Sequence, residues 1–197
     1  MPRTMILLAL ALSVGTVANA QKYSGPNCLG PFCIDRNVPA RNLFKQLGPP
    51  APRPSRLFPY CYQSQDGKKF LYVETFDSEP DVTAEVFLSD FPNCIHARKK
   101  QTTEDLGAWT TREGIRLGSP EADVVKAYGK PSSELKVDSK LYQLRIRGHQ
   151  REDKLPQLKD VGEKRIFYNG DVTTDLSAAE FGIRGGKVSY IWLSHNE

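Results

Sequence analysis

The sequence is poor in the residues that most often carry enzyme chemistry. Its 197 residues include three histidines, four cysteines and two tryptophans. The histidines, His96, His149 and His195, stand in no visible arrangement of nucleophile and base. The glycine-rich pieces are turns, and none of them forms a phosphate-binding loop. We therefore predict no catalytic residues and no cofactor.

The sequence also lacks a strong charge of either sign. Lysine and arginine number 27 against 23 aspartate and glutamate residues, which gives a formal net charge of +4. No basic helix and no dense stripe of lysine and arginine is present, so we expect no nucleic-acid partner. Hydrophobic residues make up 39% and charged residues 25% of the chain, a composition typical of a folded core.

Long hydrophobic runs are absent except at the N-terminus. Residues 1–20 contain one early arginine, a short apolar run and the small residues Ala18 and Ala20, a pattern typical of a secretory signal peptide. The run is too short to span a membrane comfortably, and no cysteine follows it to carry a lipid. We therefore expect a mature chain that begins at Gln21, has no membrane span and is periplasmic or secreted.

Four cysteines are few but even in number, and all lie in the first half of the chain. In an exported protein an even count predicts disulfides, and four cysteines allow three pairings. Cys28 and Cys33 flank a Gly-Pro turn, whereas Cys61 and Cys94 fall in strand-like runs. We favour the pairs Cys28–Cys33 and Cys61–Cys94. The spacing matches no zinc pattern, so no metal ion is expected.

One stretch, residues 114–131, has the marks of a short helix with defined ends. It reads GIRLGSPEADVVKAYGKP. Ser119 is the predicted N-cap, and Pro120 falls at the first helical position, where its missing N–H costs nothing. Gly129 can adopt the left-handed conformation that ends a helix. A helix this short is unstable alone, so it must pack against other elements.

The same pattern occurs earlier, at residues 33–50, CIDRNVPARNLFKQLGPP. Gly48 then aligns with Gly129, an offset of 129 − 48 = 81. Further on, residues 84–90 resemble residues 179–185, and a polar insertion in the second half would account for their different offset. The pattern predicts an internal duplication. The alternative is chance recurrence of a common local signal.

The remaining segments predict strands. Tight hairpin turns are expected at residues 65–67 and at Gly185-Gly186. The expected strands are residues 58–63, 69–76, 82–89, 94–99, 141–147, 163–168, 178–184 and 187–194.

We therefore predict an α+β fold, a tandem duplication of a short-helix plus antiparallel β-meander unit, with the helices packed on one face of the sheet. The first unit would span residues 21–100 and contain the disulfides. A connector over residues 101–112 would lead to the second unit, residues 113–197.

The chain resembles two groups of proteins over both halves, roughly residues 31–197, and the clearest motif lies in the second half. The residues that carry the resemblance are Ile115, Leu117, Gly118, Val124, Gly129, Pro131, Gly186, Lys187, Val188, Ile191 and Leu193. They are similar to the pattern of the small outer-membrane lipoproteins of the SmpA/OmlA type and of the tandem-repeat β-lactamase inhibitor proteins. The resemblance implies helices packed against an antiparallel sheet and, more weakly, a protein-binding role.

The functional prediction is a non-enzymatic protein-binding or inhibitor-like module of the bacterial envelope. Its open sheet face would hold a protein partner, because interface hot spots favour tyrosine, tryptophan and arginine. We expect Tyr190 and Trp192 to point the same way as Val188. The predicted binding residues are Tyr62, Tyr72, Arg145, Arg147, Tyr190 and Trp192.

Three alternatives stay open at this point. In the first alternative, the predicted aromatic binding residues belong to the core, and the arginines are surface residues that only aid solubility. An exported hydrolase would need a cleft between the two units, joining His96 or His149 to a carboxylate or serine. A structural protein of the envelope without a soluble ligand is the third.

Overall fold

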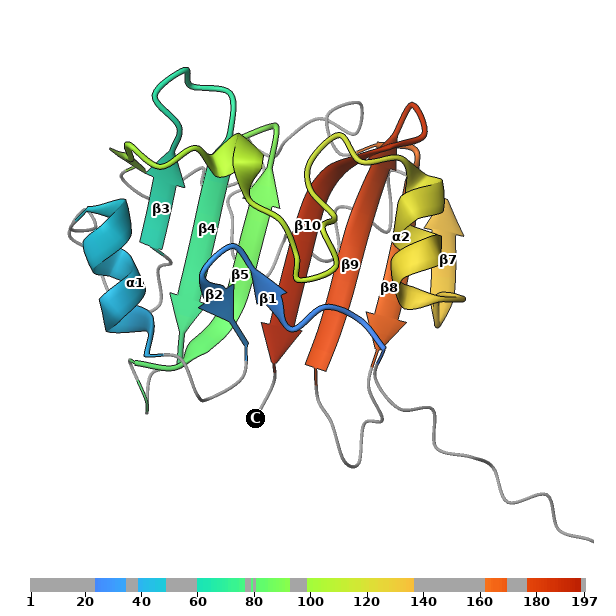
Figure 1. The fold of residues 1–197 in the computed structure, drawn as a ribbon, viewed down its shortest axis with the longest axis horizontal. Coiled ribbons are helices and arrows are strands. Elements are labelled where there is room, and N and C mark those ends of the chain that lie inside the picture. The colour runs from blue at the N-terminus through green and yellow to red at the C-terminus, as the bar shows by residue number, and fades with distance from the viewer. Residues whose placement is uncertain are drawn as a thin grey trace, which may run out of the picture.

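A computed structural model describes residues 24–34, 39–48, 60–76, 79, 81–92, 99–136, 162–169 and 177–195 (Figure 1). The predicted signal peptide, the predicted strand 141–147 and most of the predicted strand 94–99 lie outside these residues. The elements in chain order are β1 (Cys28–Leu29), β2 (Phe32–Cys33), α1 (Ala40–Leu47), β3 (Tyr60–Gln63), β4 (Phe70–Thr75), β5 (Thr83–Ser89), β6 (Lys99–Gln101), the 3-10 helix η1 (Leu106–Ala108), α2 (Glu121–Tyr128), β7 (Ser133–Lys136), β8 (Lys164–Asn169), β9 (Ser177–Arg184) and β10 (Lys187–His195).

Within the described residues, eight strands form a single mixed sheet in the order β6-β3-β4-β5-β10-β9-β8-β7. The predicted α+β tandem duplication of helix-plus-meander units is therefore wrong, because the protein is mostly β and strands from both halves share one sheet. β5 and β10 pair antiparallel, and β6 runs parallel to β3. The physical reason is that β5 and β10 would expose unpaired backbone N–H and C=O groups if the two halves formed separate sheets. Pairing β5 with β10 satisfies these groups.

Both predicted helices are present, and each is eight residues long. Gly48 and Gly129 end them at φ values of 87° and 77°, in the region that favours glycine. The predicted cap at Ser119 is wrong, since Pro120 occupies the N-cap position. The Ser119 hydroxyl instead accepts a hydrogen bond from the Arg116 backbone N–H at 3.0 Å. In the part of the chain that the structure describes, no helix has the length and apolarity needed to cross a membrane.

The helices lie on one side of the sheet, near its two ends, with the β1–β2 hairpin between them (Figure 1). We call this side the helix-covered face. One row of directly paired residues crosses six strands on it, and each member is 0% exposed. The row is Tyr62, Leu71, Leu88, Ile191, Phe181 and Ile166. The main core of the protein thus lies between the sheet and the elements that cover this face.

Each helix is attached to the sheet by a tyrosine. The Tyr62 hydroxyl on β3 donates to the backbone carbonyl of Gly48 at 3.2 Å, at the end of α1. The Tyr168 hydroxyl on β8 donates to the carbonyl of Gly129 at 3.1 Å, at the end of α2. Helix carbonyls at a C-terminus lack intrahelical partners, so both bonds satisfy groups that would otherwise need water.

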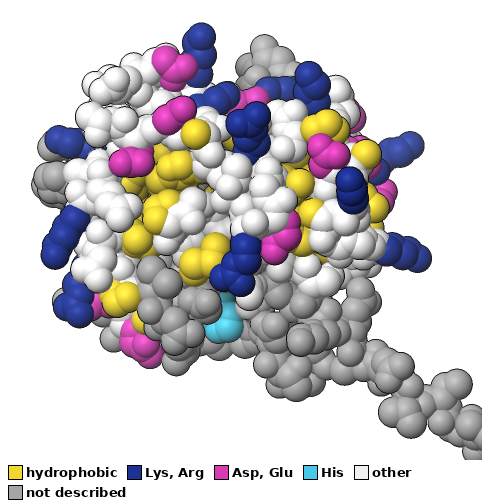
Figure 2. All heavy atoms as spheres, in the orientation of Figure 1, with side chains coloured by type: hydrophobic (Ala, Val, Ile, Leu, Met, Phe, Trp, Pro, Cys, Tyr) yellow, Lys and Arg dark blue, Asp and Glu magenta, His cyan; other side chains and the backbone are white. Residues whose placement is uncertain are grey.

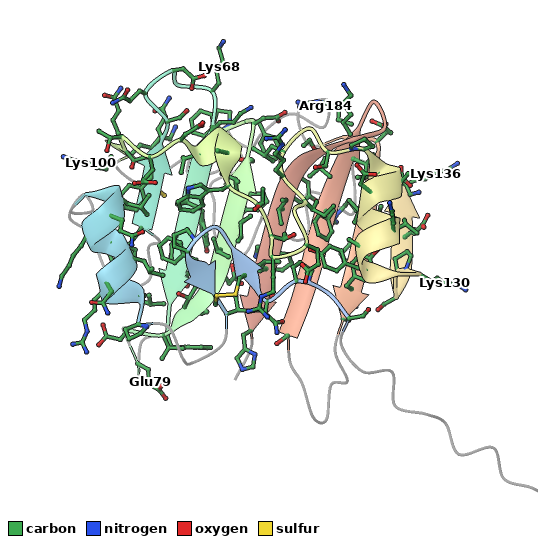
Figure 3. All side chains as sticks on the ribbon, viewed as in Figure 1. Lys68, Glu79, Lys100, Lys130, Lys136 and Arg184 are labelled. Carbon is green, nitrogen blue, oxygen red and sulfur yellow. A yellow bond between two sulfur atoms is a disulfide. The ribbon has the colours of Figure 1, made fainter. Side chains whose placement is uncertain are left out.

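The β1–β2 hairpin closes the middle of the helix-covered face. A disulfide joins Cys28 to Cys33, as predicted, and Figure 3 shows it within the hairpin. Gly30 turns the hairpin at a φ of 56° and lies so close to Trp109 that a Cβ would meet the indole at 2.6 Å. Cys61 is also disulfide-bonded. Its predicted partner Cys94 lies outside the described residues, so that pairing stays a prediction.

Charged side chains surround the sheet rather than gather in one place. Figure 2 shows Lys and Arg side chains scattered over the helix-covered side, both at its outline and within it, with Asp and Glu among them. The edge strand β7, which the sequence analysis missed, is exposed at all four positions, as is every residue of the other edge strand, β6. Lys100 and Lys136 on these edges point outward (Figure 3). Charged edge strands discourage pairing with other chains.

Candidate functional site

The opposite face of the sheet is the place where the structure combines aromatic and charged side chains. Directly paired residues form a row across β3, β4, β5, β10, β9 and β8. This row is Cys61, Tyr72, Phe87, Trp192, Glu180 and Phe167. Its composition differs sharply from the apolar row on the helix-covered face. The candidate site therefore lies on this face.

Three neighbouring members of that row, Tyr72, Phe87 and Trp192, are aromatic, and we call them the aromatic row. Tyr72 lies opposite Phe87 across β4 and β5, and Phe87 lies opposite Trp192 across β5 and β10. All three are half-buried, although Cys61 and Glu180 on either side of them are buried. Partly exposed aromatic side chains in contact positions offer area for binding at low entropic cost.

Two carboxylates border the aromatic row. Glu74 and Glu85 lie directly opposite each other on β4 and β5, on the same face. The Tyr72 hydroxyl donates to Glu74 Oε2, and Trp192 Nε1 donates to Glu85 Oε2 at 3.4 Å. Burial, together with the negative charges of Glu85 and Glu74, raises the pKa of Tyr72 far above its ordinary value. Tyr72 therefore remains a hydrogen-bond donor over the physiological pH range.

On the other side of Trp192 the face is closed by a buried ion pair. Arg165 Nε and Nη2 donate to Glu180 Oε1 and Oε2 at 2.5 Å and 2.6 Å, in a bidentate arrangement. The Tyr190 hydroxyl donates to the same carboxylate. Arg165 is 8% exposed, Glu180 3% and Tyr190 3%, so this part of the face is not open to solvent. A satisfied buried network of this kind fixes the sheet rather than binding a ligand.

Tyr190 and Trp192 do share a face, but Val188 does not share it with them. A register shift between Val188 and Tyr190 interrupts the pairing of β10 with β9. Val188 consequently belongs to the main core, opposite Ile183. The strict alternation that we predicted over β10 fails here because a β-bulge adds one residue and reverses the side-chain direction.

The structure separates the residues predicted to bind. Tyr62 lies on the helix-covered face and is fully buried, away from the others. Tyr72 and Trp192 come together through Phe87, and Tyr190 packs against Phe87 with ring centroids 5.1 Å apart. Arg145 and Arg147 lie outside the described residues.

Sequence reasoning missed Phe87, Glu74 and Glu85. The strand 82–89 alternates between residues of the main core and Glu85, Phe87 and Ser89, so its pattern did place these three on one face. What the pattern did not reveal was which neighbouring strands flank β5. That information is needed to see that Phe87 lies between Tyr72 and Trp192.

A second ion pair closes one end of the same sheet. Arg184 Nη2 donates to Asp90 Oδ2, which connects the ends of β9 and β5 across β10. Among the described residues, the buried Asp90 Oδ1 has no hydrogen-bond partner. Burial raises the pKa of the Asp90 carboxyl, against the opposing effect of the Arg184 charge.

His195 is the one histidine within the described residues. Its Nδ1 lies 3.1 Å from Ser177 Oγ, the side chain of its cross-strand neighbour at the end of β9. Within the same residues no hydrogen bond joins His195 to a carboxylate. Hydrolase chemistry needs a nucleophile, a base and a third group that orients the base. The contact between Ser177 and His195 supplies at most the nucleophile and the base.

Four tyrosines with raised pKa values, three of them buried and Tyr72 half-buried, make the stability of the protein sensitive to alkaline pH. Burial is the main cause that raises the pKa of Tyr62, Tyr72 and Tyr190, and it raises the pKa of Tyr168 to about 12. Below about pH 10 these tyrosines are protonated in both the folded and the unfolded protein, so they do not make the free energy of unfolding depend on pH. Above it the unfolded tyrosines ionise while the folded ones keep their protons, so unfolding becomes more favourable.

We therefore expect the free energy of unfolding to fall steadily as the pH rises above about 10. Urea unfolding at pH 8 and at pH 11 would measure the change, with absorbance at 295 nm to follow tyrosinate formation. A Tyr168→Phe variant should lose part of the pH dependence. Equal midpoints at the two pH values would contradict the expectation.

Comparison with known proteins gives little further information. No protein-family model and no curated protein matches the sequence. Among solved structures, the crystal structure of a DUF4309 family protein, YjgB, from Bacillus subtilis is 12% identical, with a TM-score of 0.39. The match covers 83% of this chain and 82% of that one. A similarity at this level carries no argument about fold or function.

Proposed function

We propose that this chain is an exported, non-enzymatic protein-binding module of the bacterial envelope that holds its partner on the aromatic row. The observation that carries the proposal is the half-burial of Tyr72, Phe87 and Trp192 in direct register. Aromatic side chains of this kind are enriched at the centres of protein interfaces. Glu74 and Glu85 beside the row favour a partner whose contacting segment is basic.

The envelope location rests on separate observations. The first 20 residues have the features of a signal peptide, and the Cys28–Cys33 disulfide fits an oxidising compartment. The resemblance to envelope lipoproteins and to β-lactamase inhibitors supports the same location and a binding role.

Site-specific photo-crosslinking tests the proposal. Phe87 is replaced by the photoreactive residue benzoylphenylalanine in the oxidised chain beginning at Gln21, which is then irradiated in an envelope extract of its source. The matched control carries the same residue in place of Val125, which is 36% exposed on α2 and remote from the aromatic row. We expect a cross-linked protein from position 87 and none of the same mass from position 125.

A substitution then measures how much the row contributes. Trp192→Ala should weaken binding of the identified partner by at least about 30-fold, the effect of losing an interface hot spot. Val125→Ala should leave the affinity unchanged. Near-ultraviolet circular dichroism would verify that both variants are folded. Identical cross-links from positions 87 and 125, or a folded Trp192→Ala variant that binds normally, would refute the proposal.

A further inference from the structure

We propose that the Cys28–Cys33 disulfide is a thiol-exchange site, in which a thiolate attacks Cys33 and Cys28 leaves. This inference is independent of the binding role proposed above. It rests on the burial of the two sulfur-bearing residues, on the charge beside one of them, and on the packing of the hairpin that they close.

The two cysteines differ in accessibility. Cys33 is half-buried, whereas Cys28 is 9% exposed. Thiol–disulfide exchange begins when an external thiolate reaches one sulfur of the bond, so access decides which sulfur is attacked. Cys33, the more exposed residue of the pair, is therefore the expected point of attack.

The charge beside the disulfide favours the same direction. Arg112 Nη2 lies 4.0 Å from Cys28 Sγ, although 84 residues separate them in the chain. A guanidinium group stabilises a neighbouring thiolate, and a stabilised thiolate is a better leaving group. Cys28 is thus the sulfur whose departure the protein assists. Arg112 acts in this step by its charge on the leaving Cys28 sulfur, and it forms no bond with the incoming thiol.

The chemical balance is simple. An incoming thiolate forms a new S–S bond with Cys33, the Cys28–Cys33 bond breaks, and its electron pair leaves with Cys28 as a thiolate. A second thiolate can then attack the incoming sulfur of this mixed disulfide and release Cys33 as a thiolate, so that the protein disulfide is reduced and two thiol groups of the reductant are oxidised to a disulfide. The reactant class is therefore a small or protein-borne thiol.

Exchange at this bond would have a structural consequence. The hairpin contributes Leu29, Phe32 and Ile34 to the main core, at 0%, 0% and 1% exposed. Its strands are only two residues long, and its contacts with the chain beyond include the bridge from Leu29 to Thr111 and the hydrogen bond from Gly30 N–H to the Thr110 carbonyl. A short hairpin is marginal without a cross-link, so reduction should loosen it and expose apolar surface.

The experiment uses glutathione with the oxidised chain from Gln21. The protein is incubated with reduced glutathione for increasing times, quenched with acid, alkylated and mapped by mass spectrometry. We expect the glutathione adduct on Cys33 and the alkylated thiol on Cys28. Cys61, which is disulfide-bonded and 2% exposed, serves as the internal control and should react later.

Two substitutions complete the test. Arg112→Met should slow the exchange about threefold, since the leaving thiolate loses its neighbouring charge. Arg116→Met, which removes an exposed arginine from the same connecting region, should leave the rate unchanged. An adduct on Cys28, prior reaction of Cys61, or equal rates in both arginine variants would overturn the proposal.

Discussion

Replacing Gly182 with alanine will destabilise the protein by about 3 kcal/mol, the upper range for forcing extra volume into a packed site. Gly182 is paired with Tyr190 across β9 and β10. A Cβ added to Gly182 would lie 2.0 Å from Tyr190 Cε1 and 2.2 Å from Cδ1. The tyrosine ring must therefore move, and it cannot move without losing its hydrogen bond to the buried Glu180 carboxylate. Urea unfolding monitored by circular dichroism would measure the loss.

A double-mutant cycle isolates this mechanism. If the ring is the obstacle, Gly182→Ala should cost much less in a Tyr190→Ala background than in the native protein. The comparison variant is Gly185→Ala, whose added Cβ would have no atom within 4 Å. Its only expected cost is the strain of a positive φ of 57°, about 1 kcal/mol of stability. Additive effects of the Gly182 and Tyr190 substitutions would mean that the steric explanation is incorrect.

Removing Arg165 will cost about 3 to 5 kcal/mol of stability. Arg165→Met leaves the Glu180 carboxylate buried without its bidentate guanidinium partner. Desolvation of an ion is expensive, and the opposite charge at 2.5 Å is what offsets that cost in the native protein. Thermal and urea unfolding at pH 7 would both detect a change of this size.

The double variant Arg165→Met, Glu180→Gln removes both charges while retaining an acceptor for Tyr190, and it should recover most of the lost stability. The exposed pair Arg41–Asp81, with atoms 3.3 Å apart and side chains 69% and 42% exposed, gives a surface comparison. Asp81→Asn should cost less than about 1 kcal/mol, because water screens such a pair. The interpretation fails if the surface substitution costs as much as the buried one.

Local sequence signals predicted the individual elements well. The prolines and glycines at the helix ends predicted α1 and α2, and the turn residues predicted the β3–β4 and β9–β10 hairpins. Residues 82–89 were correctly predicted as a strand, although the consecutive apolar residues Val86, Phe87 and Leu88 did not show which of them face the core. These features depend on interactions among near neighbours in the chain, which a sequence contains in full. The strand β7 was missed because all four of its residues are exposed and its pattern carries no apolar face.

The candidate site was predicted only in fragments. Tyr72 and Trp192 were named from their residue types, but their common neighbour Phe87 was not, because the pairing of its strand with β10 joins segments about 100 residues apart. Tyr62 was assigned to the same group, although it belongs to the helix-covered face. Residue type alone does not distinguish a core tyrosine that anchors a helix from one that borders the opposite face.

The sequence by itself determined where helices, hairpins and the Cys28–Cys33 disulfide form, since each depends on residues a few positions apart. Only the tertiary structure decided that β5 and β10 join the two halves into one sheet, and that a bulge turns Tyr190 away from Val188. Strand order is set by which edges bury the most apolar surface and satisfy the most backbone groups together. That choice compares arrangements of the whole chain, so no single segment encodes it.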